Sequence, residues 1–198
     1  METITAKAAA RLEALHRGEA LTPTAWRLIG WQMAQRLYAH PAWQQADTVF
    51  CFVSMTREPD TVALLQASLD AGKRVCLPRV VPGPEHRMEP VVIDRLTALA
   101  PGHLGVPEPA QGVPLTVRDL GPRALTVVPC VAAARNGVRL GHGGGYYDRF
   151  LAQFVGRKVL LCPSAVLFDT LPADTHDVPF AADEILTEQG FVSECRTR

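Results

Sequence analysis

The 198-residue sequence predicts a three-layer α/β/α sandwich around a mostly parallel, mixed sheet. Short continuous apolar runs, typical of strands buried on both faces, alternate with longer amphipathic segments. The clearest unit is a strand at Thr48–Val53, a helix at Thr61–Ala71 and a strand at Arg74–Pro78, a βαβ pattern that implies a parallel pair. With 47% hydrophobic and 20% charged residues, the composition fits one domain over residues 1–198.

Two helices are expected before the first strand. Residues Thr5–Arg17 are mainly strong helix formers, and Gly18 would end that helix. A second helix is expected to begin at Thr22-Pro23, where a capping residue precedes a proline. Apolar residues recur along it at helical spacing: Trp26, Ile29, Met33 and Leu37. Such a stripe indicates core packing, and Pro41 marks the break before the first strand.

Further elements are expected downstream. The predicted strands are Met88–Ile93, Ala124–Pro129, Lys158–Cys162 and Glu184–Leu186, and the predicted helix is Tyr146–Phe154. Residues 82–122 are rich in proline and glycine, so we expect loops and short elements over one edge of the sheet. An antiparallel edge strand is expected from this middle region or from the C-terminal region.

Charge and cysteine usage narrow the class of protein. Lys+Arg and Asp+Glu both number 20, so nothing indicates nucleic acid or a membrane as partner, and small-molecule ligands are expected. The five cysteines lack any CxxC spacing, which indicates a reduced protein without disulfides or zinc. Met1–Lys7 contains no apolar segment, and no stretch is long enough to span a membrane. We therefore expect a cytoplasmic protein, with a monomer as the default state.

The stretch Arg139-Leu-Gly-His-Gly-Gly-Gly-Tyr-Tyr-Asp148 carries the strongest functional signal. A glycine-rich loop that leads into a helix favours anions, because unpaired N–H groups and the helix dipole face the ligand. The stretch is not a Walker A motif, since no Gly-Lys-Ser/Thr follows, and it does not fit a dinucleotide fingerprint. A tight turn packed on a helix is the alternative. The arginine, histidine, two tyrosines and aspartate are, however, more polar groups than a turn requires.

Two cations near the N-terminus are candidates for the same anion. Lys7 and Arg11 lie four residues apart and so share one helix face. Like charges at this spacing are mildly destabilising unless an anion lies between them. A solvated basic face is the alternative interpretation.

Carboxylates near the loop indicate a metal ion. Asp148 would repel a bound phosphate unless a cation bridges them, and Mg²⁺ does so with one or two carboxylates while phosphate and water complete its shell. Asp177 and Asp183 are the candidates for a second ligand. A favourable charge at a helix start would also explain Asp148 alone. His176 is open to either a surface or a site role.

Other candidate groups lie around the loop. Glu58 follows the first strand, and ligands of such sheets bind beyond the carboxyl ends of the strands. We expect one of Tyr146 and Tyr147 to pack in the core and the other to stack on a ring, because neighbours at a helix start cannot both point inward. His142 is expected to face the ligand. No spacing gives a role to His16, His40, His86 or His103.

Taken together, these segments resemble the 5-formyltetrahydrofolate cyclo-ligase family, also called methenyltetrahydrofolate synthetases. The stretch from Arg139 to Asp148 looks like the family signature. The other matches are Lys7-Ala-Ala-Ala-Arg11, Ser54-Met-Thr-Arg-Glu58-Pro-Asp-Thr61, Leu104-Gly-Val-Pro-Glu-Pro109, Gly137-Val-Arg139 and His176-Asp177 with Asp183-Glu-Ile-Leu-Thr187. Ordered matches at compatible spacing are specific where any one alone would be weak.

The resemblance implies an ATP- and Mg²⁺-dependent reaction. ATP phosphorylates the formyl oxygen of 5-formyltetrahydrofolate, N10 attacks the activated carbon, and 5,10-methenyltetrahydrofolate, ADP and phosphate are released. By position, ATP would be held by Lys7, Arg11, Arg139, Leu140, Gly141, His142, Gly143, Gly144, Gly145, Tyr146 and Tyr147. The folate site would be lined by Val53, Glu58, His142, Gly143, Gly144, Gly145 and Tyr146. Asp148 and Asp177 would hold Mg²⁺, and the catalytic residues would be Arg139, Glu58 and Lys7.

The sequence also departs from the family pattern. Cys130-Val-Ala-Ala133-Ala134 stands where the family usually has Gly-x-x-Phe-Asp, and Val166 stands where it usually has Gln. None of these changes removes an expected phosphate or metal residue. Two alternatives stay open: a non-catalytic folate- or nucleotide-binding relative, and another α/β enzyme acting on a phosphorylated metabolite.

Overall fold

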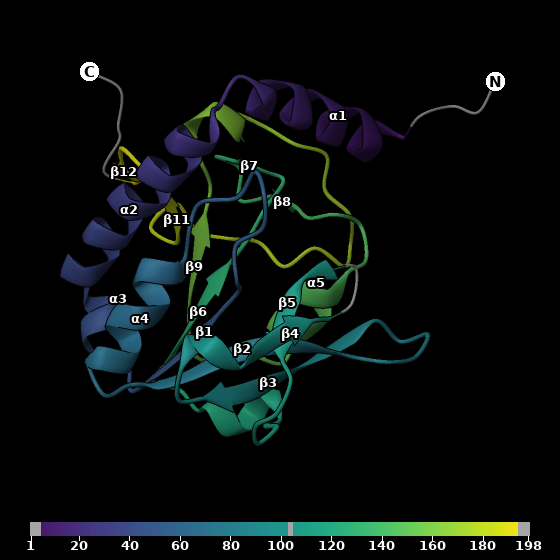
Figure 1. Ribbon diagram of the computed structural model, residues 1–198. Helices are drawn as coiled ribbons and strands as arrows, with labels where there is room; N and C mark the ends of the chain where they lie inside the picture. Colours follow the sequence, from purple (N-terminus) through teal and green to yellow (C-terminus); the bar gives the residue numbers. More distant parts are fainter. Residues whose placement is uncertain (1–4, 103–104, 194–198) are drawn as a thin grey trace.

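The computed structural model describes residues 5–102 and 105–193, and its centre is a seven-stranded sheet in the order β12-β11-β9-β6-β1-β2-β3 (Figure 1). These strands are β1 (Thr48–Cys51), β2 (Arg74–Val81), β3 (Arg87–Ile93), β6 (Ala124–Val128), β9 (Arg157–Leu161), β11 (Ile185–Thr187) and β12 (Gly190–Phe191). The helices are α1 (Ala6–Glu19), α2 (Pro23–Ala39), α3 (Pro41–Gln44), α4 (Val62–Asp70) and α5 (Tyr146–Leu151). The predicted α/β sandwich with a mixed sheet is confirmed.

The central strands are parallel and are buried on both faces by the segments that connect them. Every residue of β1 and β6 is buried, as expected for the middle of a doubly covered sheet. β1 pairs in parallel with β2 and with β6, which confirms the parallel pair predicted from the βαβ pattern. Both edges are antiparallel: β3 pairs with β2, and β12 pairs with β11.

The two faces of the sheet are covered differently. α2, α3 and α4 pack on one face, where Met33, Leu37 and Leu64 enter a core shared with β1 (Figure 1). The opposite face is covered by α1, α5 and a small second sheet, and its core includes Phe50 and Phe150, whose rings stack with centroids 4.4 Å apart. Polar groups of the candidate site belong to this second, less helical layer.

Several short elements were absent from the sequence-based prediction. The second sheet has the order β10-β7-β8 and consists of β7 (Ala132–Ala134), β8 (Arg139–Leu140) and β10 (Leu167–Phe168). A two-stranded sheet joins β4 (Leu99–Pro101) to β5 (Pro107–Pro109), and the 3₁₀ helices are η1 (Leu96–Ala98), η3 (Val117–Leu120) and η4 (Ser164–Val166). Elements of two to four residues contain less than two periods of a strand or helix pattern, so hydrophobic periodicity cannot reveal them.

Element ends also differ from expectation. α5 ends at Leu151, three residues before the predicted end, although Phe154 still stacks on Phe150. α1 continues past Gly18 to Glu19, and this glycine is buried against Trp26 of α2. The helix ends one residue beyond Gly18, so the expected end of α1 near this glycine is confirmed. No helix in the described residues is both long and apolar enough to cross a membrane.

The strand order indicates that a ligand would bind between the carboxyl ends of β1 and β6. From β1 the chain builds outward to β2 and β3, whereas from β6 it builds in the opposite direction to β9, β11 and β12. A crevice forms at the carboxyl ends of strands where the order reverses in this way. The loop after β1 carries Glu58, and the segment after β6 leads through β7 and β8 to the glycine loop.

Candidate active site

The glycine loop is held between β8 and α5. β8 pairs antiparallel with β7, which buries Leu140 in the core, so this residue contributes packing and not a polar contact. Gly141 follows directly, and a Cβ atom there would lie 2.7 Å from Nη1 of Arg139. Gly145 has φ of +70° and precedes the first residue of α5. The positive φ favours glycine at the end of the loop, whereas a side chain at Gly141 would displace the end of the Arg139 side chain.

The loop presents main-chain donors that the protein does not use itself. Within residues 5–102 and 105–193, the N–H groups of residues 142–145 donate no hydrogen bond. His142 and Gly143 are exposed, and Arg149 holds the loop from behind by donating to the Gly144 carbonyl oxygen at 3.0 Å. Unused amides around an exposed glycine turn fit the predicted anion cradle.

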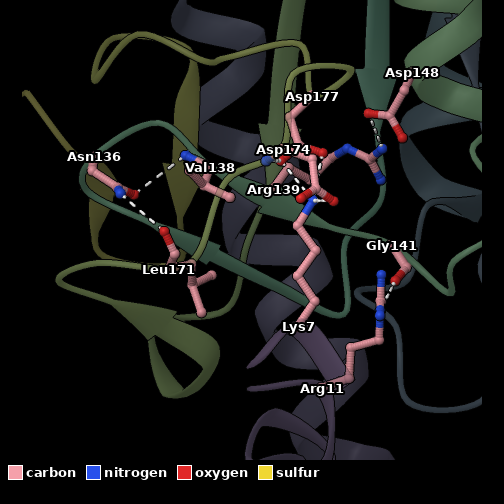
Figure 2. Close-up of polar contacts among 10 residues, drawn as sticks. All are labelled: Lys7, Arg11, Asn136, Val138, Arg139, Gly141, Asp148, Leu171, Asp174 and Asp177. Carbon is pink, nitrogen blue, oxygen red and sulfur yellow. Dashed lines mark hydrogen bonds and ion pairs between the residues drawn. The ribbon is translucent and has the colours of Figure 1, made fainter. Parts of the chain in front are cut away.

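Both predicted cations of α1 point at this region (Figure 2). Arg11 Nε donates to the Gly141 carbonyl oxygen at 2.7 Å. Lys7 Nζ lies 2.8 Å and 2.7 Å from the two carboxylate oxygens of Asp177 and 2.7 Å from Asp174. The Lys7 side chain is only 16% exposed. The interpretation of this helix face as a freely solvated surface is therefore wrong.

A second ion pair lies beside the first. Arg139 Nη2 donates to Asp148 at 2.8 Å, and the Arg139 side chain is 5% exposed. Its Nε is buried without a hydrogen-bond partner. Arg139 also acts electrostatically on Asp177. We call Lys7, Asp177, Arg139 and Asp148 the charge network, which holds two positive and two negative groups.

The Asn136 turn brings the two halves of the charge network together. Asn136 Nδ2 donates to the Leu171 carbonyl oxygen at 3.2 Å, and the Val138 N–H donates to Asn136 Oδ1 at 3.4 Å (Figure 2). Gly137 in the same turn accepts a hydrogen bond from the Phe180 N–H at 2.9 Å. The turn between β7 and β8 is thus tied to both sides of the 171–180 segment, which positions Asp177 next to Arg139.

Electrostatics within the charge network favour its ionised forms. Burial lowers the pKa of Lys7, but its hydrogen bonds to Asp174 and Asp177 and their negative charges outweigh this and raise the pKa. Burial raises the pKa of Asp177, whereas hydrogen bonds from Lys7 and the Asp174 N–H, with the charges of Lys7 and Arg139, lower it overall. Lys7 and Asp177 therefore stabilise each other's charged forms.

Glu58 lies in a different environment at the end of β1. Its carboxylate accepts one hydrogen bond, from the Met55 N–H at 2.8 Å, and burial raises the pKa of the carboxyl above its ordinary value. Tyr147 interacts electrostatically with Glu58 and Arg139, and its hydroxyl oxygen is buried without a hydrogen-bond partner. Burial raises the pKa of the Tyr147 phenol far above its usual range. Poorly satisfied polar groups at one place indicate that a ligand completes them.

The two tyrosines differ as expected. The Tyr147 hydroxyl is buried and its ring packs edge-on against Phe150, whereas the partly exposed Tyr146 ring contacts His86, with centroids 5.3 Å apart. His86 lies at the tip of the β2–β3 hairpin with φ of +48°. The sequence analysis found no role for His86, and no local spacing links residues 86 and 146. The unusual backbone conformation of His86 is visible only in the structure.

Other predicted residues are placed as follows. Val53 packs with the α2 and α4 core, so its side chain is structural. Asp183 and His176 are exposed. The positions that depart from the family pattern, Cys130, Ala133, Ala134 and Val166, all belong to the core beneath β7 and η4. Leu104 and Cys195 lie outside the described residues.

The available carboxylates suit a metal ion that takes most of its ligands from water and substrate. Among the described residues, no cluster of three or more His, Cys, Asp or Glu side chains could hold a metal. Asp148 and Asp177 both belong to the charge network and are part-buried. Two carboxylates beside the predicted anion cradle fit Mg²⁺, which is usually bound by one or two carboxylates and completed by phosphate and water.

Comparison with known proteins connects this geometry to a family. The 5-formyltetrahydrofolate cyclo-ligase family model matches residues 3–188. The chain belongs to this family. It is 34% identical over 172 residues to 5-formyltetrahydrofolate cyclo-ligase of Escherichia coli K12, an alignment that covers 84% of this chain and 92% of the relative. The Mycolicibacterium smegmatis cyclo-ligase is 31% identical over 188 residues, which cover 91% and 88% of the two chains.

Solved structures agree with this membership. The NMR structure of Aquifex aeolicus 5,10-methenyltetrahydrofolate synthetase superposes with a TM-score of 0.81 at 28% identity, covering 98% of this chain and 96% of that one. The synthetase from Mycoplasma pneumoniae superposes with a TM-score of 0.70 at 21% identity, which supports the fold. As a member of the family, the protein is an enzyme, an ATP-dependent cyclo-ligase.

Proposed function

We propose that this cyclo-ligase converts 5-formyltetrahydrofolate and ATP to 5,10-methenyltetrahydrofolate, ADP and phosphate. Family membership over residues 3–188 supports the reaction. The observation that carries the assignment to this site is that Arg11 contacts the glycine loop at Gly141, while Lys7 and Arg139 are held in the charge network beside it. Phosphoryl transfer depends mainly on positioning and charge neutralisation, which such a cluster supplies.

In this scheme the nucleotide binds at the glycine loop. The free amides of residues 142–145 would hold phosphate oxygens, with Lys7, Arg11 and Arg139 neutralising their charge. Asp148 and Asp177 would hold Mg²⁺, which supplies further charge neutralisation on the phosphates. Phosphate oxygens would then replace the carboxylates as partners of Lys7 and Arg139, leaving the carboxylates free for the metal.

The folate would bind on the Glu58 side. The Glu58 carboxylate would orient the substrate through one of its N–H groups or its formyl group, and Tyr147 would donate its unpaired hydroxyl to a substrate oxygen. Tyr146 would stack on a ring of the substrate, backed by His86. The transferred phosphoryl group would lie between the nucleotide at the glycine loop and the folate on the Glu58 side. Arg139 lies at this point, since it contacts Asp148 and its guanidinium carbon is 5.8 Å from the centre of the Tyr147 ring.

The remaining parts of the proposal concern the whole molecule. We infer a single domain over residues 1–198, supported by one continuous sheet from β1 to β12. We also infer a monomer that acts in the cytoplasm on small molecules and binds neither nucleic acid nor membrane. The balanced charge of 20 basic and 20 acidic residues, together with free thiols at Cys51, Cys76, Cys130 and Cys162, supports this inference.

A direct assay tests the reaction. The purified protein should form the methenyl product from 5-formyltetrahydrofolate and MgATP, followed by the near-ultraviolet absorbance of the product, with ADP released in equal amount. Lack of product together with measurable folate binding would favour a non-catalytic relative instead.

The metal assignment is tested with Asp148→Asn. This variant should respond much less to Mg²⁺, so that its turnover rises only at a Mg²⁺ concentration on the order of tenfold higher or more. Asp183→Asn is the matched control, because Asp183 is an exposed carboxylate of the same region. An Asp148→Asn enzyme with the wild-type Mg²⁺ dependence would show that this carboxylate is not a metal ligand.

A further inference from the structure

Two thiols meet at the carboxyl ends of neighbouring strands. Cys130 follows β6 and Cys162 follows β9, and these strands are parallel with Val128 opposite Leu160. The same register continued by two residues brings Cys130 opposite Cys162. Cys130 Sγ donates to the Leu161 carbonyl oxygen at 3.4 Å, so this thiol lies against the main chain directly before Cys162, whose own Sγ donates to the Pro163 carbonyl oxygen at 3.6 Å.

The backbone spacing at this point suits a disulfide. Neighbouring strands lie roughly 4.7–4.9 Å apart. The Cα atoms of disulfide-bonded cysteines are usually about 4.4–6.8 Å apart. Forming the bond requires both sulfur atoms to leave these carbonyl oxygens, at a strand spacing that a disulfide can span.

The two thiols differ in access. Cys130 is partly exposed, whereas Cys162 is buried. Burial, reinforced by the hydrogen bond and charge of Cys130, raises the pKa of the Cys162 thiol well above its ordinary value. An oxidant therefore reaches Cys130 first, and Cys162 is the neighbouring thiol that can resolve the product.

We propose that Cys130 and Cys162 form a redox modification site that closes to an intramolecular disulfide when a peroxide oxidises Cys130. The Cys130 sulfur attacks one peroxide oxygen, the O–O bond breaks, and sulfenic acid and water form. The Cys162 sulfur then attacks the sulfenic sulfur, its proton and the hydroxyl leave as a second water, and the disulfide results. The two thiols are oxidised by two electrons, and the peroxide is reduced to water.

The site is connected to Arg139. Val131, the residue after Cys130, donates its N–H to the Leu140 carbonyl oxygen at 2.7 Å, and Ala133 of β7 pairs with Arg139 of β8. Disulfide closure draws Cys130 toward Cys162, which displaces the start of the segment that pairs with β8 and holds Arg139. Oxidation should therefore weaken nucleotide binding, a consequence that rests on the function proposed for Arg139.

The modification is tested by mass. The reduced full-length protein is treated with hydrogen peroxide, the remaining thiols are alkylated, and the intact and digested masses are measured. We expect the intact protein before alkylation to become about 2 Da lighter, with one peptide pair linked through Cys130 and Cys162 and with full reversal by dithiothreitol. Cys130→Ala and Cys162→Ala should abolish the link, whereas Cys76→Ala, a matched change at a buried thiol of β2, should preserve it.

The outcomes separate the two parts of the proposal. A Cys130 that gains about 32 Da as sulfinic acid, or that links to Cys195, would overturn the site. ATP affinity, measured by calorimetry on the reduced and the peroxide-treated protein, should fall several-fold on oxidation and recover on reduction. In Cys130→Ala, peroxide should not change the ATP affinity. This variant is preferred because Cys130 is partly exposed, so its substitution should disturb folding least. An oxidised wild-type protein with the Cys130–Cys162 link and unchanged ATP affinity would overturn the connection to Arg139.

Discussion

The two halves of the site are in opposite electrostatic states. In the charge network, Lys7 is paired with Asp177 and Arg139 with Asp148. On the Glu58 side, a desolvated carboxyl receives one main-chain hydrogen bond, and the nearby Tyr147 hydroxyl is buried without a partner. The charges of the first half are paired without a ligand, although Arg139 Nε has no hydrogen-bond partner, whereas the second half combines a desolvated carboxyl with an unpartnered hydroxyl.

This difference separates stability from catalysis. Charges that already compensate each other stabilise the protein without ligand. When a nucleotide binds, its phosphates have to replace the carboxylates as partners of the cations. Polar groups buried without partners destabilise the empty protein and gain their hydrogen bonds only from a ligand. Substitutions in the charge network should therefore lower stability, whereas substitutions on the Glu58 side should preserve or raise stability while lowering activity.

The largest effect is expected for Arg139→Met. It leaves Asp148 without its cation next to a buried site, so the free energy of unfolding should fall by about 3 kcal/mol, measured by urea denaturation. Adding Asp148→Asn to this variant should restore part of the loss. Arg79→Met is the control, because Arg79 forms an ion pair with Glu89 at 2.6 Å and is 28% exposed. A loss equal to that of the control would mean that Arg139 is not a stabilising centre.

The next effect concerns Glu58→Gln, which keeps the shape and the acceptor for the Met55 N–H. Turnover should fall on the order of 10²-fold, because the amide lacks the charge that orients the substrate. Burial raises the pKa of Glu58 above its reference of 4.5, so the folded state binds its proton more tightly than the unfolded state does. Well below pH 4.5 the carboxyl is protonated in both states and does not affect the free energy of unfolding. As the pH rises from 4.5 through the higher folded pKa, the carboxyl lowers the free energy of unfolding.

The stability of this variant gives an independent test. Melting temperatures of Glu58→Gln and the wild type should coincide at low pH, and the variant should melt at the higher temperature at neutral pH. A variant that is less stable than the wild type at pH 7 would place Glu58 among the stabilising groups and contradict the comparison.

A smaller effect is expected for Lys7→Ala. Loss of one charged hydrogen bond should weaken ATP binding about tenfold, or roughly 1.4 kcal/mol, while folate binding changes much less. Isothermal titration with each ligand separates the two. Arg17→Ala is the matched control on the same helix, since Arg17 pairs with the exposed Glu13. Equal weakening of both ligands would mean that Lys7 does not belong to the nucleotide half.

The smallest effect is expected for Tyr147→Phe. Removal of a buried hydroxyl without a partner should leave the free energy of unfolding unchanged or raise it by up to about 1 kcal/mol. The Michaelis constant for the folate substrate should rise, because the ligand loses its hydrogen bond. Tyr38→Phe is the control: this hydroxyl donates to the Ala63 carbonyl oxygen at 3.1 Å, so its removal should destabilise slightly and leave the kinetics unchanged. A large loss of stability in Tyr147→Phe would indicate that the hydroxyl has a partner within the protein.

Local features of the sequence determined the main fold and the nucleotide half of the site. Continuous apolar runs predicted β1, β6 and β9, and the four-residue spacing of Lys7 and Arg11 placed both on one face of α1. The glycine loop was predicted to be an anion site because glycine lets main-chain amides approach a ligand closely. These features depend on neighbours a few residues apart, for which periodicity and composition are informative.

The tertiary structure alone decided which distant groups meet. Lys7 contacts Asp177 across 170 positions of the chain, His86 contacts Tyr146, and Cys130 meets Cys162 at the ends of paired strands. β7 and β8 hold Arg139 in place, yet they contain three and two residues. Strands this short have no periodic signal and form only because a packed core surrounds them, which is why the partners of each charge could not be predicted from the sequence.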